Sequence, residues 1–183
     1  GLDLRIQNAV DEGDSAPYGP KFGPIGLKQV LMAAKNHPHW KAPLGKNQGR
    51  GVAVGYWFNG GGESSAVVSA NEDGTVVVST GSPDIGGSRA STAQMAAETL
   101  GIPYEAVRPI IADTNSVGFT QTTGGSRVTY ATGMTVINAC NMVTAEMCKR
   151  AAKLWKIEPE NVIWEDGCAR PAGKRAGEFP PMT

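Results

Sequence analysis

The sequence has few of the features that mark a disulfide-stabilised, metal-clustered or strongly charged protein. Its 183 residues include only three cysteines, an odd number with no Cys-x-x-Cys pair. This argues against a disulfide framework, a zinc finger and an iron–sulfur cluster. Seventeen basic residues balance seventeen acidic ones, so no broad field attracts a nucleic acid or an anionic membrane. We therefore expect a small ligand or a protein partner, with no nucleic acid and no membrane.

Segments that direct a protein into a membrane are also missing. No apolar run is long enough to cross a bilayer, and the N-terminus has no charged-then-apolar signal segment. A cytoplasmic location is the resulting expectation. The chain begins with Gly1 instead of methionine, which suggests a piece excised from a larger protein.

Glycine, by contrast, is abundant, with 24 residues, and its clusters divide the sequence. We expect an arm over residues 1–48, made of a helix, a loop rich in Gly and Pro, and a second helix that ends at His37-Pro38. A boundary near Gly49 then separates the arm from a compact half-domain over residues 49–183. We expect this half-domain to be truncated at its C-terminus.

Within residues 49–183, runs typical of strands alternate with runs typical of helices. The expected strands are 52–58, 65–70, 75–80, 107–112 and 162–164, and the expected helices are 90–100 and 128–154. Asn71 to Gly74 has the composition of a hairpin turn. This order predicts an α+β fold of two layers, with helices packed on a mixed sheet and a helical and extended arm before it.

Apolar residues at helical spacing predict which sides of the two helices are buried. The expected stripes are Ala93, Ala96, Ala97 and Leu100 in the first helix, and Val136, Cys140, Val143, Met147, Ala151 and Leu154 in the second. Cys140 and Cys148 fall on this second helix, and we interpret both as small core residues.

The tetrapeptide Gly-Gly-Ser-Arg occurs twice, at Gly86–Arg89 and at Gly124–Arg127. Each copy follows an expected strand and opens an expected helix. Glycine lets the backbone approach a ligand closely, and the first turn of a helix has unpaired N–H donors. Those donors and the helix dipole suit a phosphate or another electron-rich ligand. Two such turns suggest one long polar ligand held at two places.

Hydroxyl side chains beside the second copy extend this candidate site. Threonine and serine hydroxyls both donate and accept hydrogen bonds, although Thr123 or Ser126 could equally serve as a helix cap. The candidate binding residues are Gly86, Gly87, Ser88, Arg89, Thr122, Thr123, Gly124, Gly125, Ser126 and Arg127.

The first turn also has a nucleotide-binding interpretation. Gly81, Gly86 and Ser88 stand where a Walker A loop has its glycines and serine, but Gly87 occupies the lysine position. That lysine pairs with the β- and γ-phosphates of a nucleotide. One alternative is therefore a non-catalytic nucleotide- or anion-binding module with a degenerate Walker-like turn at 81–88. Another is a structural assembly domain in which both turns hold no ligand.

Several ordered motifs together resemble one family. They are Gly49–Tyr56, Glu72–Gly81, Asp84–Arg89, Ala97–Pro103, Ala112–Asn115 and Gly124–Arg127, with Arg5–Asn8 in the arm. In this order and spacing they resemble the molybdenum-cofactor-binding large subunit of the xanthine dehydrogenase and aldehyde oxidase family. The resemblance covers nearly the whole chain.

The resemblance implies a cofactor, partners and a reaction. The cofactor is molybdopterin, as such or as a dinucleotide, and the two Gly-Gly-Ser-Arg turns would hydrogen-bond it. Because the pterin sulfurs hold the metal, the protein supplies donors more than metal ligands. The whole enzyme would hydroxylate an aldehyde or N-heteroaromatic carbon with oxygen from water. Its partners would be the rest of the large subunit and the iron–sulfur and flavin (FAD) groups on other domains or subunits.

Two positions bear on catalysis. Many relatives have glutamine where this chain has Gly87, and glycine cannot make that glutamine's contact with the molybdenum ligands. Near the C-terminus, Gly177–Pro180 resembles the family's Gly-Glu-x-Pro motif, which carries the catalytic base. In the family that motif lies much farther downstream, so we interpret Glu178 as part of a solvated loop. The sequence thus predicts no catalytic residue and no metal ligand in this chain, which alone would be inactive.

Overall fold

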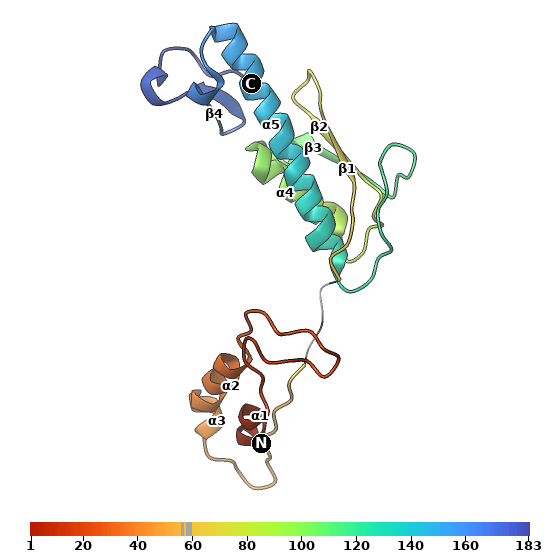
Figure 1. Ribbon diagram of the computed structural model, residues 1–183, viewed down its shortest axis with the longest axis vertical. Coiled ribbons are helices and arrows are strands. Elements are labelled where there is room, and N and C mark those ends of the chain that lie inside the picture. The colour runs from red at the N-terminus through yellow and green to blue at the C-terminus, as the bar shows by residue number, and fades with distance from the viewer. Residues whose placement is uncertain (56, 58–59) are drawn as a thin grey trace. The chain divides into compact units, whose positions relative to one another are not determined.

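A computed structural model of the chain describes residues 1–55, 57 and 60–183 (Figure 1). The chain divides into two compact units, 1–56 and 57–183. The boundary expected near Gly49 stays a prediction about domains. None of the helices within the described residues combines the length and the apolar character needed to span a bilayer.

The first unit contains three short helices around a loop. These are α1 (Leu2–Gln7), α2 (Leu27–Asn36) and α3 (Pro38–Lys41). The buried Leu2 and Leu31 mark the sides on which α1 and α2 pack together. The loop at 11–26 is ordered, because Gly13 N–H donates to Phe22 O at 2.9 Å and Ser15 pairs with Lys21.

One expectation for this unit is confirmed and one is wrong. The second helix ends at His37-Pro38 as expected, since α2 stops at Asn36. The short helix α3, which the sequence does not predict, then begins at Pro38, because proline suits a first helical position and the His37 ring accepts a hydrogen bond from His39 N–H at 3.2 Å. The strand expected over 52–58 is not formed by residues 52–55. Residues 56, 58 and 59 of that expected strand lie outside the described residues.

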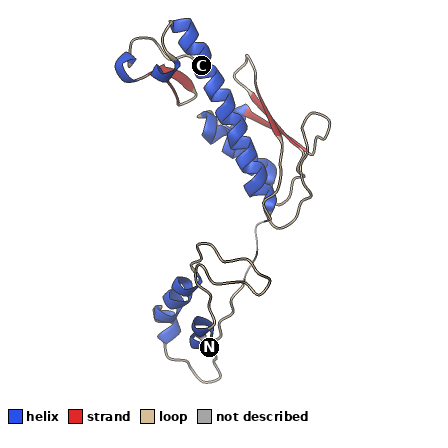
Figure 2. Ribbon diagram, viewed as in Figure 1, coloured by secondary structure: helices blue, strands red, loops and turns tan. Residues whose placement is uncertain are grey.

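The second unit is built on a three-stranded sheet. Its strands are β1 (Ala66–Ala70), β2 (Val76–Thr80) and β3 (Val107–Ile111), in the order β1-β2-β3. β1 pairs with β2 antiparallel through the expected hairpin turn, and β2 pairs with β3 parallel. Helices α4 (Ser88–Leu100) and α5 (Gly133–Trp155) pack on one face of this mixed sheet (Figure 2). The predicted α+β fold, with helices packed on a mixed sheet, is confirmed.

The core lies between the sheet and the two helices. It is formed by Val76, Val78, Val107, Ala93, Ala96, Ala97, Leu100, Val136 and Cys140. The stripe expected on α4 is therefore confirmed, and its alanines let α5 approach closely. On α5 the expected stripe holds as far as Ala151, but Leu154 is 67% exposed and Ala152 is buried instead.

A second hairpin, which the sequence pattern does not predict in full, follows α5. Its strands are β4 (Val162–Glu165) and β5 (Cys168–Pro171), joined at Asp166-Gly167. Ala169 exchanges backbone hydrogen bonds with Met182 at 2.7 and 3.0 Å, and the Trp155 ring stacks on Phe179. The C-terminal residues are thereby held against the end of α5.

The two long helices run parallel. Met95 of α4 lies against Gly133 at the start of α5, while Leu100 lines the same groove as Val143 and Met147 farther along α5. Because each helix follows one of the parallel strands β2 and β3, both begin at the edge where those strands end. The positive ends of their dipoles therefore share that edge.

Candidate functional site

Both Gly-Gly-Ser-Arg copies lie at the carboxyl edge of β2 and β3. The first copy ends the seven-residue turn after β2 and enters α4 directly. The second ends a longer loop after β3 and enters a single π-turn, Val128–Thr132, which continues into α5. Sequence repetition thus corresponds to equivalent places in the fold.

The first copy presents its glycine backbone outward. Gly86 and Gly87 have φ of 60° and 80°, in the left-handed region that favours glycine, and both are exposed. Their N–H groups make no hydrogen bond within the described part of the chain. The Ser88 hydroxyl is buried and points inward, because it accepts from Ile85 N–H at 3.1 Å and donates to Pro83 O at 3.2 Å. Ser88 thus shapes the turn from inside.

An acidic side chain already caps the helix that the first copy opens. Asp84 Oδ1 accepts from the Arg89 backbone N–H at 2.9 Å, and Asp84 Oδ2 lies 3.3 Å from Arg89 Nε. The Arg89 side chain is otherwise exposed, at 58%. Negative charge at a helix N-terminus offsets the positive end of the dipole. The first turn therefore offers backbone donors but little net positive charge.

The second copy is bound to the glycine-rich segment that precedes β1. Gly60 N–H donates to Gly125 O at 2.6 Å. Thr122, Gly124 and Ser126 are exposed, whereas Thr123 and Gly125 are half-buried. A side chain at Gly60 would approach Gly124 O to 3.3 Å, so the close contact of the two backbones depends on glycine there.

Arg127 has a different role from its counterpart Arg89. Its side chain is 3% exposed, and its Nε donates to Gly61 O at 2.5 Å and its Nη1 to Gln121 O at 2.8 Å. Its Nη2 donates to Glu63 O and, at 2.6 Å, to Ser64 Oγ. No aspartate or glutamate of the described chain forms an ion pair with it. A buried cation with only neutral acceptors favours an anion nearby.

A line of hydroxyls, half-buried at Ser64 and buried at Thr132 and Ser82, continues from Arg127. Ser64 Oγ lies 3.2 Å from Thr132 Oγ1, which lies 2.8 Å from Ser82 Oγ. Thr132 and Ser82 are 0% and 2% exposed. Ser82 belongs to the turn of the first copy and Thr132 ends the π-turn after the second, so these hydroxyls join the two.

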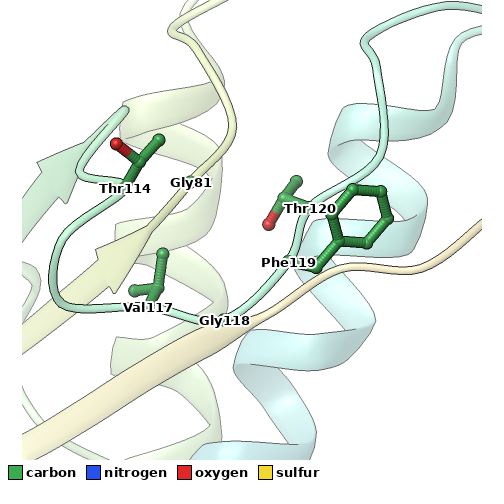
Figure 3. A pocket seen from close by; sticks show the side chains of 6 residues that line it. All are labelled: Gly81, Thr114, Val117, Gly118, Phe119 and Thr120. Carbon is green, nitrogen blue, oxygen red and sulfur yellow. The ribbon is translucent and has the colours of Figure 1, made fainter.

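A cavity of about 300 Å³ opens beside Gly81, between the loop after β3 and the end of β2 (Figure 3). Its lining residues are Gly81, Thr114, Val117, Gly118, Phe119 and Thr120. Figure 3 shows Val117 and Thr120 on either side of Gly81, and a side chain at Gly81 would approach Thr120 Oγ1 to 3.0 Å. The cavity lies in the loops that carry the two copies, although none of the ten candidate residues lines it.

Hydrogen bonds to Ser65 close this loop against the start of β1. Gly118 N–H donates to Ser65 Oγ at 3.0 Å, and Ser65 N–H donates to Thr120 Oγ1 at 3.2 Å. At the other end of the loop, the Ser116 hydroxyl, followed by the Asn115 N–H, lowers the pKa of Asp113. Asp113 is thus an ionised anchor of its own loop, which is not the role that a Walker-like interpretation assigns to it.

Other polar residues stay apart from this edge. Glu178, in the Gly-Glu-Phe-Pro stretch, accepts from Arg175 Nη1 with both carboxylate oxygens, at 2.8 and 3.0 Å. Within the described residues, no group of three or more His, Cys, Asp or Glu side chains could hold a metal ion. The donors available at the edge are therefore backbone amides, hydroxyls and the Arg127 guanidinium.

Four residues at this edge were not among the candidates: Ser64, Ser82, Asp84 and Thr132. Asp84 lies two positions before the first copy, and an aspartate shortly before a helix is a capping signal that could have identified it. The other three are separated by up to 68 positions in the sequence. No local pattern indicates that their hydroxyls meet.

Comparisons with known proteins agree with the resemblance in the motifs. Residues 29–180 match the family model described as molybdopterin cofactor-binding domain. The chain is 30% identical over 167 residues to a putative xanthine dehydrogenase molybdenum-binding subunit of Escherichia coli K12, covering 82% of this chain and 22% of the relative.

Solved structures give the same result for the fold. Quinoline 2-oxidoreductase from Pseudomonas putida 86 shares 28% identity over 60% of this chain and 14% of its own, with a TM-score of 0.53. CO dehydrogenase from Oligotropha carboxidovorans shares 20% identity over 93% of this chain and 25% of its own, with a TM-score of 0.66. The nucleotide-binding alternative has no support among these comparisons.

The chain spans about a fifth of the length of the E. coli relative. The predicted resemblance is confirmed, as is molybdopterin as the cofactor of the family. The chain belongs to the molybdopterin cofactor-binding domain family.

Proposed function

We propose that the chain is part of the large subunit of a molybdenum hydroxylase and holds molybdopterin at the edge where α4 and the π-turn before α5 begin. The contacts would come from Gly86 and Gly87 in the first turn and from Thr122, Thr123, Gly124, Gly125 and Ser126 in the second. Ser88 and the two arginines of the repeats would support these contacts from the sides.

The buried guanidinium of Arg127 is the observation that carries this proposal. It directly precedes the π-turn that leads into α5, near the positive end of that helix dipole, and no carboxylate of the described chain forms an ion pair with it. A phosphate of molybdopterin, or of its dinucleotide form, would supply the missing negative charge. The exposed amides of Gly86, Gly87 and Gly124 add donors for the polar edge of the pterin.

The donors at this edge therefore fit molybdopterin, although the two Gly-Gly-Ser-Arg turns differ in charge. Asp84 already caps α4, so the first turn suits a neutral acceptor such as a pterin carbonyl. The second turn, beside Arg127, suits the phosphate. The first turn would thus favour the pterin and the second the phosphate.

When bound, molybdopterin supplies the redox chemistry that hydroxylates a carbon with oxygen from water. The chain's own residues bind and orient the cofactor. We propose that the substrate is an aldehyde or an N-heteroaromatic compound. The remaining large subunit, together with iron–sulfur and flavin groups on other domains or subunits, would complete the enzyme.

The experiment is to purify the complete protein that carries this chain and to measure molybdenum by elemental analysis and pterin by fluorescence after acid release. Gly124→Val is the informative variant, because φ at Gly124 is not in the left-handed region and no atom of the described residues lies within 4 Å of an added Cβ. The folded protein accommodates this side chain, but a ligand close to the backbone does not. Gly23→Val, at a position that is equally open, is the matched control.

We expect wild type and Gly23→Val to carry both molybdenum and pterin, and Gly124→Val to lose most of both. A folded wild-type protein without pterin would overturn the proposed function. If Gly124→Val carried as much molybdenum and pterin as wild type, the second turn would not be in contact with the cofactor.

A further inference from the structure

Thr132 stands at the meeting point of three segments that are far apart in the sequence. Its side chain is 0% exposed, and its Oγ1 lies 2.8 Å from Ser82 Oγ and 3.2 Å from Ser64 Oγ. Ser82 follows β2 in the turn of the first Gly-Gly-Ser-Arg copy, and Ser64 precedes β1. Thr132 itself follows the second copy by five positions. A single hydroxyl thus connects all three.

Arg127 favours one direction for the hydrogen bonds in this group. A guanidinium only donates, so Ser64 Oγ accepts from Arg127 Nη2 at 2.6 Å. The Ser64 hydrogen is then available for Thr132, and the Thr132 hydrogen for Ser82. Chains of aligned hydrogen bonds that begin at a charged donor strengthen one another in a buried setting. Thr132 is the middle link, so removing its hydroxyl breaks both contacts.

The backbone holds Thr132 in this place from two sides. Thr132 is the last residue of the π-turn Val128–Thr132, and π-turns within helices occur frequently at functional sites. The next residue, Gly133, lies so close to Met95 of α4 that an added Cβ would come within 2.5 Å of the Met95 sulfur. The start of α5 therefore packs directly against the Met95 side chain of α4.

We propose that Thr132 is a positioning residue whose buried hydroxyl fixes the second Gly-Gly-Ser-Arg turn relative to the first, so that both grip molybdopterin together. This inference rests on the proposed function. Without the hydroxyl, the turns keep their local conformations but lose their common spacing, and the cofactor is held by one turn at a time.

The test compares three variants in the complete protein. Thr132→Val keeps the shape of the side chain and removes the hydroxyl, whereas Thr132→Ser keeps the hydroxyl. Thr92→Val is the matched control: Thr92 is 1% exposed, and its hydroxyl donates only to Ser88 O and Arg89 O within its own helix. All three are measured for molybdenum and pterin content per protein and for melting temperature.

We expect the pterin content per protein to be at least fivefold lower in Thr132→Val than in wild type. The pterin contents of Thr132→Ser and Thr92→Val should stay within twofold of the wild-type value. A general loss of stability would lower the pterin content of Thr92→Val as well. Equal loading of folded Thr132→Val and wild type overturns the inference and leaves the proposed function intact. A wild-type protein without pterin overturns the proposed function first.

Ser82→Ala keeps the inference testable if Thr132→Val does not fold. This change removes the far end of the hydroxyl line and leaves the contact between Ser64 and Thr132 in place. We expect a two- to fivefold loss of pterin. Loading of a folded Ser82→Ala equal to that of wild type would contradict a positioning role for the line.

Discussion

Arg127 and Ser64, 63 positions apart in the sequence, are joined by a 2.6 Å hydrogen bond from guanidinium to hydroxyl. The same guanidinium reaches the carbonyls of Gly61 and Glu63 and, on the other side, that of Gln121. A glycine-rich stretch with no strand or helix is thereby fixed beside the second turn. The buried arginine therefore organises the backbone on which the proposed site depends.

Arg127→Lys should destabilise the protein strongly, although the charge is kept. A lysine ammonium lacks the planar fork and cannot reach four acceptors in different directions. Three backbone carbonyls and the Ser64 hydroxyl would lose the donor of a part-buried hydrogen bond, which predicts a cost of about 3 kcal/mol in the free energy of unfolding. Urea denaturation measures this cost. Arg150→Lys is the control, because Arg150 is 70% exposed and its ion pair in the described chain is with Glu146, so its exchange should cost less than about 0.5 kcal/mol. Similar losses of unfolding free energy in Arg127→Lys and Arg150→Lys would contradict the inference that Arg127 fixes the segment 61–64.

Asp84→Ala should destabilise the start of α4 by about 1 kcal/mol, the usual cost of removing a side chain that accepts from a first-turn amide. Asp84→Asn keeps the acceptor for Arg89 N–H and should recover most of this loss. The partly exposed ion pair with Arg89 adds little to stability. Melting temperatures of the three proteins, at low and at high salt, separate the two contributions. A large loss in Asp84→Asn that high salt abolishes would show that charge is decisive instead.

The elements that follow from local patterns are the ones that the sequence predicts correctly. The hairpin turn at Asn71–Gly74 and the alanine stripe of α4 are encoded within a few residues, and both form as expected. The exposed Leu154 departs from its pattern because α5 ends one residue later. At a helix end, the neighbouring elements decide which residue is covered. Here Trp155 packs against the second hairpin instead.

The errors concern contacts between distant residues. The apolar run 52–55 has the composition of a strand, but a strand needs a partner, and no strand of the described residues pairs with it. β5 is unpredicted because Cys168–Pro171 has no alternating pattern, and its place depends on β4 and on Met182. The repeated tetrapeptide is the sharpest case. Arg89 and Arg127 have the same local sequence but different environments. Arg89 pairs with Asp84, whereas Arg127 donates hydrogen bonds to the segment 61–64.

Gly101→Ala should be among the most destabilising glycine substitutions. An added Cβ would lie 2.6 Å from the backbone nitrogen of Gly167, where the end of α4 touches the β4–β5 turn. Neither backbone can move without breaking the packing, which predicts a cost of about 3 kcal/mol or more. Gly177→Ala is the control, because φ at Gly177 is +78° compared with +69° at Gly101, but no atom of the described residues lies within 4 Å of an added Cβ. Backbone strain alone should cost this control about 1 kcal/mol. Equal losses would mean that strain, and not the contact with Gly167, sets the cost.

Cys140 should make stability fall between pH 9 and pH 11. Its thiol is fully buried in the core, and burial raises its pKa from 9.0 to about 11. In this range the unfolded chain loses the thiol proton while the folded protein keeps it, so the free energy of unfolding decreases as pH rises. Two pKa units correspond to roughly 2 to 3 kcal/mol.

The measurement for Cys140 is the difference in unfolding free energy between wild type and Cys140→Ala at pH 8, 10 and 11. All other ionisable groups are common to both proteins, so their contributions cancel in the difference. Cys148, whose pKa is also raised by burial, is retained in both. We expect the difference in unfolding free energy between wild type and the variant to shrink steadily from pH 9 to pH 11.

We also expect Cys140 to resist thiol reagents at pH 8, because the thiolate is the reactive form. A constant difference across this range, or rapid labelling of Cys140 in the folded protein, would contradict the burial of its thiol.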